Sequence, residues 1–241
     1  MGLSPDPPVR VDRPVMHMGW HELAYLHWPY DPAEVDRLLP DGLRADVAEG
    51  SAWVGLIPFW MDRIRFAGLP VVPHLSSFPE TNVRTYVVDR SGRRGIWFFS
   101  LDVDRLVPAL VARTTYRLPY CWGPMRIERR GTRIRYEGRR RWPAPVGAGS
   151  VVEVEIGERI PDPAVSHLEH FFTAAWGLYS RFGGRLLWAP VDHPRWPLHR
   201  AEVTELRQDL IEAAGLPSPA GSPTVHWSPG VRVRVAPPRS A

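Results

Sequence analysis

The stretch TNVRTYVVDRSGRRGIWFFSLDV, residues 81–103, indicates the fold class of this chain. Both of its halves are rich in β-branched and aromatic residues, which favour extended backbone. Ser91 and Gly92 stand between the halves and are typical of a tight turn. The stretch therefore predicts a β-hairpin.

Two further stretches predict hairpins of the same kind. LRADVAEGSAWVGLIPFWM, residues 43–61, would turn at Glu49-Gly50, and GPMRIERRGTRIRYEGRRRW, residues 123–142, would turn near Gly131. Single strands are expected over residues 21–30 and over residues 224–228. The chain is therefore expected to be a β-dominated α+β protein.

A few helices are expected between these strands. Asp31 with Pro32, and Asp162 with Pro163, have the capping residue and proline typical of a helix start, and Gly215 is typical of a helix end. The helices are predicted over residues 31–39, 104–116, 162–180 and 206–215.

Length and composition predict one soluble domain. A chain of 241 residues can bury one sizeable core, so we expect a flexible arm over residues 1–14, a single domain over 15–235 and a flexible tail over 236–241. The single cysteine excludes an internal disulfide framework. No secretory signal is visible and no apolar run approaches the ~20 residues of a membrane span. We expect a cytoplasmic protein without a membrane partner.

All thirty basic residues are arginine, and the chain contains no lysine. Pyridoxal-phosphate enzymes, P-loop proteins and Schiff-base aldolases or decarboxylases all require a lysine amine, so these classes are excluded. No cofactor is expected. The net charge of +4 is a weak argument for an acidic partner.

The strand ETNVRTYV has one polar face. Glu80, Asn82, Arg84 and Tyr86 point one way because side chains alternate along a strand. Successive residues on one face lie about 7 Å apart, so Glu80 and Asn82 could hold one small molecule between them. The simpler alternative is a half-exposed strand whose polar face meets solvent.

The third hairpin carries an arginine-rich face over residues 126–141. This face could bind phosphates as a β-ribbon does, or could be an ordinary solvated, edge-protecting surface. Nucleic-acid binding is the less favoured hypothesis, because no recognisable module or row of stacking aromatics accompanies the arginines. Because side chains alternate along a strand, this arginine-rich face would carry Arg133, Arg135, Glu137, Arg139 and Arg141.

Other chemistry has little support in the sequence. No metal site is predicted, since His167, His170, Asp192-His193 and His199 are scattered and no His-Glu-x-x-His motif is present. A serine hydrolase would need a Gly-x-Ser-x-Gly elbow, which is also absent. Cys121 is more typical of a small buried residue than of a nucleophile.

Several ordered blocks of the chain resemble a known family. These blocks span about His17 to Leu206 and include LHWPYDPAEVDRLLPDGLRADVAEGSAWVGLIPFWM, FPETNVRTYV, GIWFFSLDVDRLVPALVARTTYRLPY and RYEGRR. They resemble the bacterial domain-of-unknown-function family typified by YqjF, which is similar to acetoacetate decarboxylase. The resemblance implies a cone-shaped antiparallel β-barrel with a few surrounding helices and a ligand cavity inside.

The resemblance also implies where a site would lie. Ala112-Arg113 matches the end of the decarboxylase helix, Pro119 matches its proline, and Tyr120 takes the place of the reactive lysine. Glu80 matches an acidic residue on the preceding strand. By this register Tyr120 faces the cavity and Cys121 does not.

These residues lead to two hypotheses. In the first, Glu80 and Tyr120 are catalytic and Asn82, Arg84 and Arg113 bind the ligand in a lysine-independent enzyme acting by acid/base chemistry on a carbonyl or carboxylate compound, as a lyase, isomerase or hydrolase. Burial would raise the pKa of Glu80, Tyr120 would donate to an oxyanion, and Arg84 would orient a carboxylate. In the second, the protein is a noncatalytic binding barrel. A homo-oligomer is a further expectation from the resemblance alone.

Overall fold

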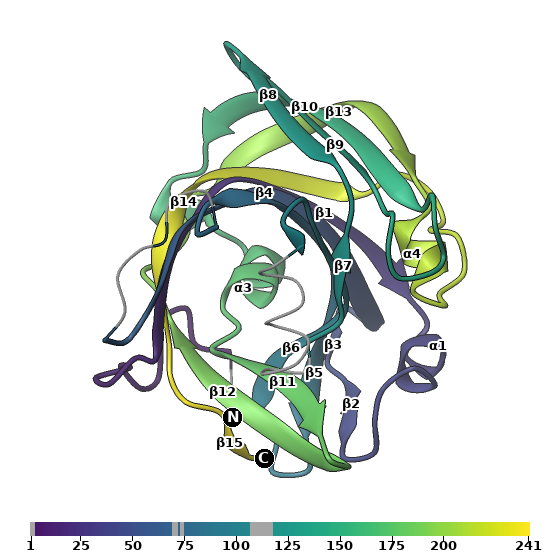
Figure 1. The fold of residues 1–241 in the computed structure, drawn as a ribbon. Helices are drawn as coiled ribbons and strands as arrows, with labels where there is room; N and C mark the ends of the chain where they lie inside the picture. Colours follow the sequence, from purple (N-terminus) through teal and green to yellow (C-terminus); the bar gives the residue numbers. More distant parts are fainter. Residues whose placement is uncertain (1–2, 69–71, 73–74, 107–117) are drawn as a thin grey trace.

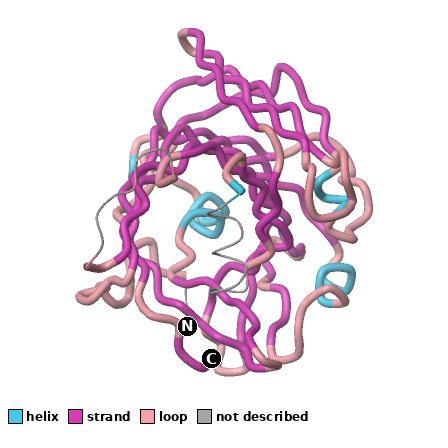
Figure 2. Tube along the Cα trace, viewed as in Figure 1, coloured by secondary structure: helices cyan, strands magenta, loops and turns pink. Residues whose placement is uncertain are grey.

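The computed structural model describes residues 3–68, 72, 75–106 and 118–241. Strands dominate these residues, and the helices are few and short (Figures 1 and 2). Most of the predicted helix over residues 104–116 lies outside the described residues, as does Arg113. No helix among the described residues is long and apolar enough to cross a lipid bilayer.

The helical elements are α1 Pro32–Asp36, the 3-10 turn η1 Asp162–Ala164, α3 His167–Thr173 and α4 Leu210–Ala213. The strands are β1 Met16–Tyr30, β2 Leu43–Ala45, β3 Val47–Ala48, β4 Ser51–Phe66, β5 Phe78–Asp89, β6 Arg94–Val103, β7 Tyr120–Trp122, β8 Met125–Arg130, β9 Arg133–Arg139, β10 Gly149–Arg159, β11 Gly177–Phe182, β12 Arg185–Asp192, β13 His199–Gln208, β14 Thr224–Val235 and β15 Arg239–Ser240.

The sheet curls into a nearly closed barrel. Its strand order includes the run β12-β11-β6-β5-β4-β1-β14, and β12 also pairs with β14 through Val191 with Val235 and Asp192 with Arg234. The pairs are antiparallel except for β6 with β11 and β6 with β7, which are parallel. Figure 1 looks along this ring and shows α3 inside it.

An outer layer covers one side of the barrel. The strands β13, β10, β9 and β8 continue the sheet beyond β14 and lie over the outside of β1 and β4 (Figure 1). The apolar cluster between these layers includes Trp28, Leu56, Val83, Tyr136 and Val154. Because this cluster occupies the face of β5 that carries Val83, the side chains of Glu80, Asn82 and Arg84 lie on the inner face.

The helix α3 fills part of the interior. Ser166 accepts a hydrogen bond from the backbone of Glu169, and the Glu169 side chain accepts one from Ser166 in return, which fixes the start of the helix. Phe171 and Phe172 are buried against aromatic residues of the barrel wall.

The three predicted hairpins are confirmed, but three helix predictions are too long. Of residues 31–39, only α1 is helical. The predicted helix over 162–180 is helical only at η1 and α3, because Gly177 begins strand β11 and packs against Trp188; a β-carbon there would lie 2.2 Å from Trp188 Nε1. Likewise, of residues 206–215, Leu206–Gln208 extend strand β13, and only α4 is helical. The last predicted strand, 224–228, continues to Val235.

Contacts place both expected flexible ends against the barrel. Asp6 forms an ion pair with Arg195, and the backbone N–H of Val11 donates to Asp192. At the other end, β15 pairs with β12.

Candidate functional site

The site begins with β5, which is buried along its whole length. Strands β4 and β6 pair with its two edges, and apolar clusters lie on both of its faces. The alternative that its polar face meets solvent is therefore wrong. Glu80, Asn82, Arg84 and Tyr86 all lie on the face opposite Val83, toward the interior of the barrel.

Glu80 lies against Tyr120. The Tyr120 hydroxyl donates to Glu80 Oε2 at 3.5 Å, and the Glu80 side chain is only 2% exposed. Burial raises the pKa of Glu80 to about 8, against the opposing hydrogen bonds from Asn82 and Tyr120, while the nearby Asp102 charge raises it further. Near neutral pH this carboxyl can therefore both hold and release a proton.

Tyr120 reaches Glu80 because β7 runs parallel beside β6. Leu101 is its partner in that register, and Tyr120 packs against both inner apolar clusters while remaining partly exposed. Burial of its hydroxyl, followed by the nearby Glu80 charge, raises the pKa of Tyr120 well above its ordinary value. Tyr120 therefore keeps its proton and acts as a donor. Cys121 is buried beside Asp102 in the same register and belongs to neither inner cluster.

Asn82 lies between Glu80 and Arg84 on the inner face. It is 4% exposed, and its side-chain oxygen has no hydrogen-bond partner among the described residues. A buried amide oxygen without a partner costs free energy, so this atom can accept a hydrogen bond from a ligand.

The structure does not bring Arg84 to Glu80. Arg84 Nη2 donates to Tyr86 Oη at 3.1 Å and to the Phe172 carbonyl at 3.3 Å, on the side of α3. The Arg84 guanidinium lies over the Tyr25 ring at 5.6 Å. Its Nε has no acceptor, and no carboxylate of the described residues forms an ion pair with it.

A small cavity adjoins Arg84. Its volume is about 20 Å³, enough for one water-sized group. The side chains around it include Trp20, Phe172, His193 and Trp196. This part of the interior therefore combines an arginine that has no carboxylate partner in the described part of the chain with a space next to it.

Sequence reasoning missed three polar residues near Arg84. His27 Nε2 lies 2.8 Å from Tyr86 Oη, and burial, followed by the Arg84 charge, holds the pKa of His27 well below its usual range. Tyr25 Oη has no hydrogen-bond partner among the described residues. His193 directly follows the last residue of β12 and lines the small cavity. Alternation along HELAYLHWPY places Tyr25 and His27 on one face, a signal that the sequence does contain.

No group of three histidine, cysteine or acidic side chains within the described part of the chain could hold a metal ion. His167 and His170 lie on α3, whereas His199 begins β13.

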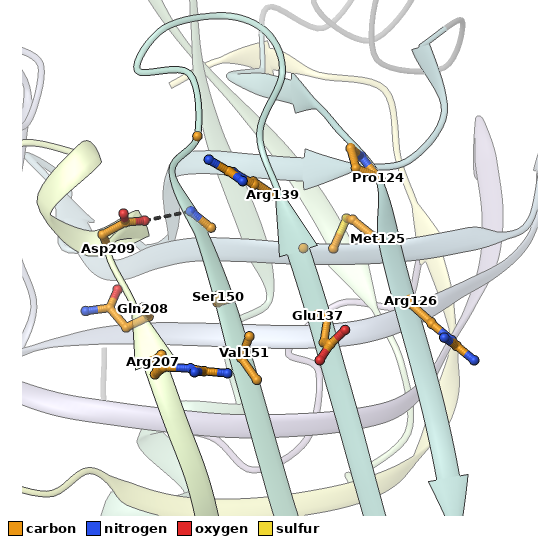
Figure 3. A pocket seen from close by; sticks show the side chains of 13 residues that line it. Pro124, Met125, Arg126, Glu137, Arg139, Ser150, Val151, Arg207, Gln208 and Asp209 are labelled. Atoms are coloured by element: carbon orange, nitrogen blue, oxygen red, sulfur yellow. Dashed lines mark hydrogen bonds between the residues drawn. The ribbon is translucent and has the colours of Figure 1, made fainter.

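The arginine-rich hairpin is largely neutralised by glutamates of the outer sheet. Arg133 pairs with Glu155 at 2.6 Å, and Arg135 pairs with both Glu137 and Glu205. A hollow of about 760 Å³ at the end of this sheet is lined by side chains of both charges. Figure 3 shows Glu137 on β9 and the Asp209 carboxylate, which accepts a hydrogen bond from the Gly149 N–H. These pairings leave less positive charge for a nucleic-acid backbone than the sequence suggested.

The DUF2071 family model, described as an uncharacterized conserved protein, matches residues 17–232. The chain belongs to the DUF2071 family. Among curated proteins, this DUF2071 chain is 30% identical over 223 residues to the uncharacterized protein YqjF of Bacillus subtilis (strain 168), covering 89% of the chain and 87% of YqjF.

Solved structures show that the DUF2071 protein has the acetoacetate decarboxylase-like fold. An acetoacetate decarboxylase-like enzyme from Sphingomonas wittichii RW1 matches with a TM-score of 0.65 at 10% identity, covering 97% of this chain and 96% of that one. The enduracididine biosynthesis enzyme MppR complexed with pyruvate matches with a TM-score of 0.65 at 15% identity, covering 97% and 92%. Acetoacetate decarboxylase from Legionella pneumophila matches with a TM-score of 0.63 at 10% identity, covering 96% and 92%.

Proposed function

We propose that the protein is a lysine-independent enzyme that binds a small carbonyl compound bearing a carboxylate and moves a proton on it. The observation that carries this proposal is the buried Glu80 carboxyl in contact with the Tyr120 hydroxyl, with a Glu80 pKa of about 8. The absence of lysine from the chain excludes an imine intermediate on a lysine side chain. That MppR was solved with pyruvate, a carbonyl acid, supports this ligand class.

Each side chain has a separate part in this reaction. Ionised Glu80 removes the proton from the carbon next to the ligand carbonyl, and the electrons of that C–H bond move to the carbonyl oxygen. Tyr120 donates a hydrogen bond to this oxygen as its negative charge develops. Asn82 supplies its unpaired side-chain oxygen to a donor group of the ligand. Glu80 then returns the proton.

Arg84 is the proposed anchor for the ligand carboxylate, with Arg113 as a second ligand-binding residue. Glu80 and Arg84 are four positions apart on an extended strand, a span of roughly 13 Å between their α-carbons. A ligand that contacts both must carry its carboxylate several bonds away from its carbonyl group. We therefore expect a longer oxo acid to bind more tightly than a three-carbon one.

Proton exchange tests this proposal without knowledge of the final product. Oxo acids of three to eight carbons are incubated with the protein in D₂O, and deuterium incorporation next to the carbonyl is followed by NMR. Wild-type protein should accelerate exchange for the longer acids, and Glu80→Gln should abolish the acceleration while retaining ligand affinity. The matched control is Glu158→Gln, because Glu158 is an exposed residue of β10.

The second candidate is a noncatalytic binding barrel. The observation that favours it is the tight interior beside Arg84, where α3 leaves only about 20 Å³. Saturable oxo-acid binding that Arg84→Met abolishes, with no exchange above background in wild type, would support this candidate and contradict the enzyme.

A further inference from the structure

A second hollow, of about 940 Å³, lies at the rim of the barrel, and we call it the rim groove. Strands β1, β4 and β14, the segment after β12 and the N-terminal arm all contribute to it. Its lining contains two aspartates, Asp6 and Asp192, against six arginines: Arg10, Arg63, Arg65, Arg195, Arg232 and Arg234.

Half of these arginines have no counterion among the described residues. Among the six, Arg63, Arg195 and Arg234 form ion pairs with Asp62, Asp6 and Asp192. The exposed side chains of Arg10, Arg65 and Arg232 form no ion pair with any residue that the structure describes. The groove therefore carries an excess of three positive charges.

Strand register concentrates this charge. His17 of β1 is the direct partner of Arg65 on β4 and of Arg234 on β14, so three basic residues lie side by side across neighbouring strands. Of the two arginines, Arg65 has no counterion among the described residues, whereas Asp192 neutralises Arg234. Burial, followed by the charges of Arg65 and Arg234, lowers the pKa of His17, so this ring adds little positive charge near neutral pH. An anion bound in the groove would compensate the charge of Arg65.

The shape and composition of the rim groove fit a small molecule. Its volume lies within the range of ~300–1,000 Å³ that is typical of small-molecule sites. Among the described residues that line it there is no tryptophan, tyrosine or phenylalanine, so these residues provide none of the stacking platforms of a single-stranded nucleic-acid site. Guanidinium groups bind phosphate and carboxylate groups through paired hydrogen bonds.

The rim groove also adjoins the interior. His193 lines both this groove and the small cavity beside Arg84. Burial lowers the pKa of His193 to about 4, so this side chain adds no positive charge near neutral pH. The excess charge of the groove thus comes from arginines that remain cationic at every physiological pH.

We propose that the rim groove binds a small anion carrying two or more phosphate or carboxylate groups, through Arg10, Arg65 and Arg232. This site is separate from Glu80 and Tyr120 and does not depend on their chemistry.

Calorimetric titration of the full-length protein with inorganic pyrophosphate and with citrate tests the proposal. At least one of the two should bind saturably, more tightly than orthophosphate, and more weakly as ionic strength rises. Preference for pyrophosphate would identify a phosphorylated ligand, and preference for citrate a polycarboxylate.

Two double variants test whether the anion binds in the rim groove. Arg65→Gln/Arg232→Gln should weaken binding by about a hundredfold, since each lost charge-assisted contact corresponds to about tenfold. Arg133→Gln/Arg207→Gln, which removes the same charge from exposed positions of the outer sheet, should leave binding within about twofold. Equal weakening by both double variants, or no saturable binding of either probe by wild type, would overturn the proposal. Both arginines of the first variant are exposed, and unchanged unfolding without probe verifies its fold.

Discussion

Two buried arginines of this protein have opposite surroundings. Arg140, 5% exposed, donates Nε and Nη2 to the two oxygens of Asp102 at 2.8 Å each, in the barrel wall. Arg84, 6% exposed, has no carboxylate partner among the described residues and an Nε without an acceptor. A buried charge without a partner costs several kcal/mol. The buried arginine of the barrel wall is therefore neutralised by a carboxylate of the chain itself. The interior instead contains polar groups, Arg84 and Glu80 among them, that suit an external ligand.

Removing the wall arginine should have the largest effect. Arg140→Met leaves the Asp102 carboxylate buried without its partner and should lower the free energy of unfolding by about 3–5 kcal/mol, measured by urea denaturation. Asp102→Leu/Arg140→Met should recover most of this loss. The exposed Arg181→Met is the control and should change stability by less than about 0.5 kcal/mol. A small loss in Arg140→Met would remove the contrast between the two arginines.

The interior carboxyl should make stability depend on pH. The folded-state pKa of Glu80 is about 8, above its ordinary value of 4.5. Between these values the unfolded chain releases a proton that the folded protein keeps, so this group makes stability fall as pH rises from about 4.5 to about 8. Glu80→Gln has no carboxyl to ionise, so its stability should not fall in this way. Its free energy of unfolding should exceed that of wild type by a few kcal/mol at pH 9 and should equal it near pH 4.

Urea denaturation of both proteins across this pH range measures the difference. Glu158→Gln should retain the wild-type slope. Parallel pH profiles for wild type and Glu80→Gln would contradict a buried, mostly protonated carboxyl.

Removing the interior arginine should cost much less than removing the wall arginine. Arg84→Met loses hydrogen bonds to Tyr86 and Phe172, worth about 1 kcal/mol each, but also removes an uncompensated charge. Tyr86 Oη still donates to the Phe172 carbonyl at 2.8 Å, so neither acceptor loses every partner. We expect a loss of less than about 2 kcal/mol by urea denaturation. A loss equal to that of Arg140→Met would show that Arg84 is structurally satisfied.

The smallest effect should come from removing the Tyr120 hydroxyl, which should change only the pKa of Glu80. The hydrogen bond from Tyr120 lowers the pKa of Glu80, so Tyr120→Phe should move that pKa upward. Carboxyl NMR titration measures the change. Tyr30→Phe, which removes a hydroxyl bonded to the Pro217 carbonyl outside the site, should leave it unchanged. A downward movement in Tyr120→Phe would contradict the proposed contact.

Local periodicity predicted that Glu80, Asn82 and Arg84 share one face of β5 and that Tyr120 and Cys121 point in opposite directions, because alternation along a strand is a property of the backbone itself. It did not predict that this face of β5 points into the barrel rather than to solvent. It did not predict that Gly177 begins a strand rather than continuing a helix, since Trp188 packs there from a separate strand.

The other features that the sequence did not predict depend on pairings between strands that are far apart in the chain. The neighbours of Arg84 come from β1, β5 and α3, and the rim groove depends on the register of β1 with β4 and β14. Neither the surroundings of Arg84 nor the rim groove could be predicted from the pattern of any single stretch of sequence. Likewise, the charge on the arginine-rich hairpin depended on glutamates of β10 and β13.

The most direct test of the central claim is the pKa of Glu80 itself. Protein labelled with ¹³C at glutamate side chains is titrated by NMR, and the resonance missing from Glu80→Gln identifies the carboxyl. We predict a pKa near 8, as expected for a carboxyl that is buried with no cation beside it among the described residues and is held beside the Tyr120 hydroxyl. A value near 4.5 would mean that Glu80 is solvated or neutralised by a partner, and would contradict its role as the proton-transferring group.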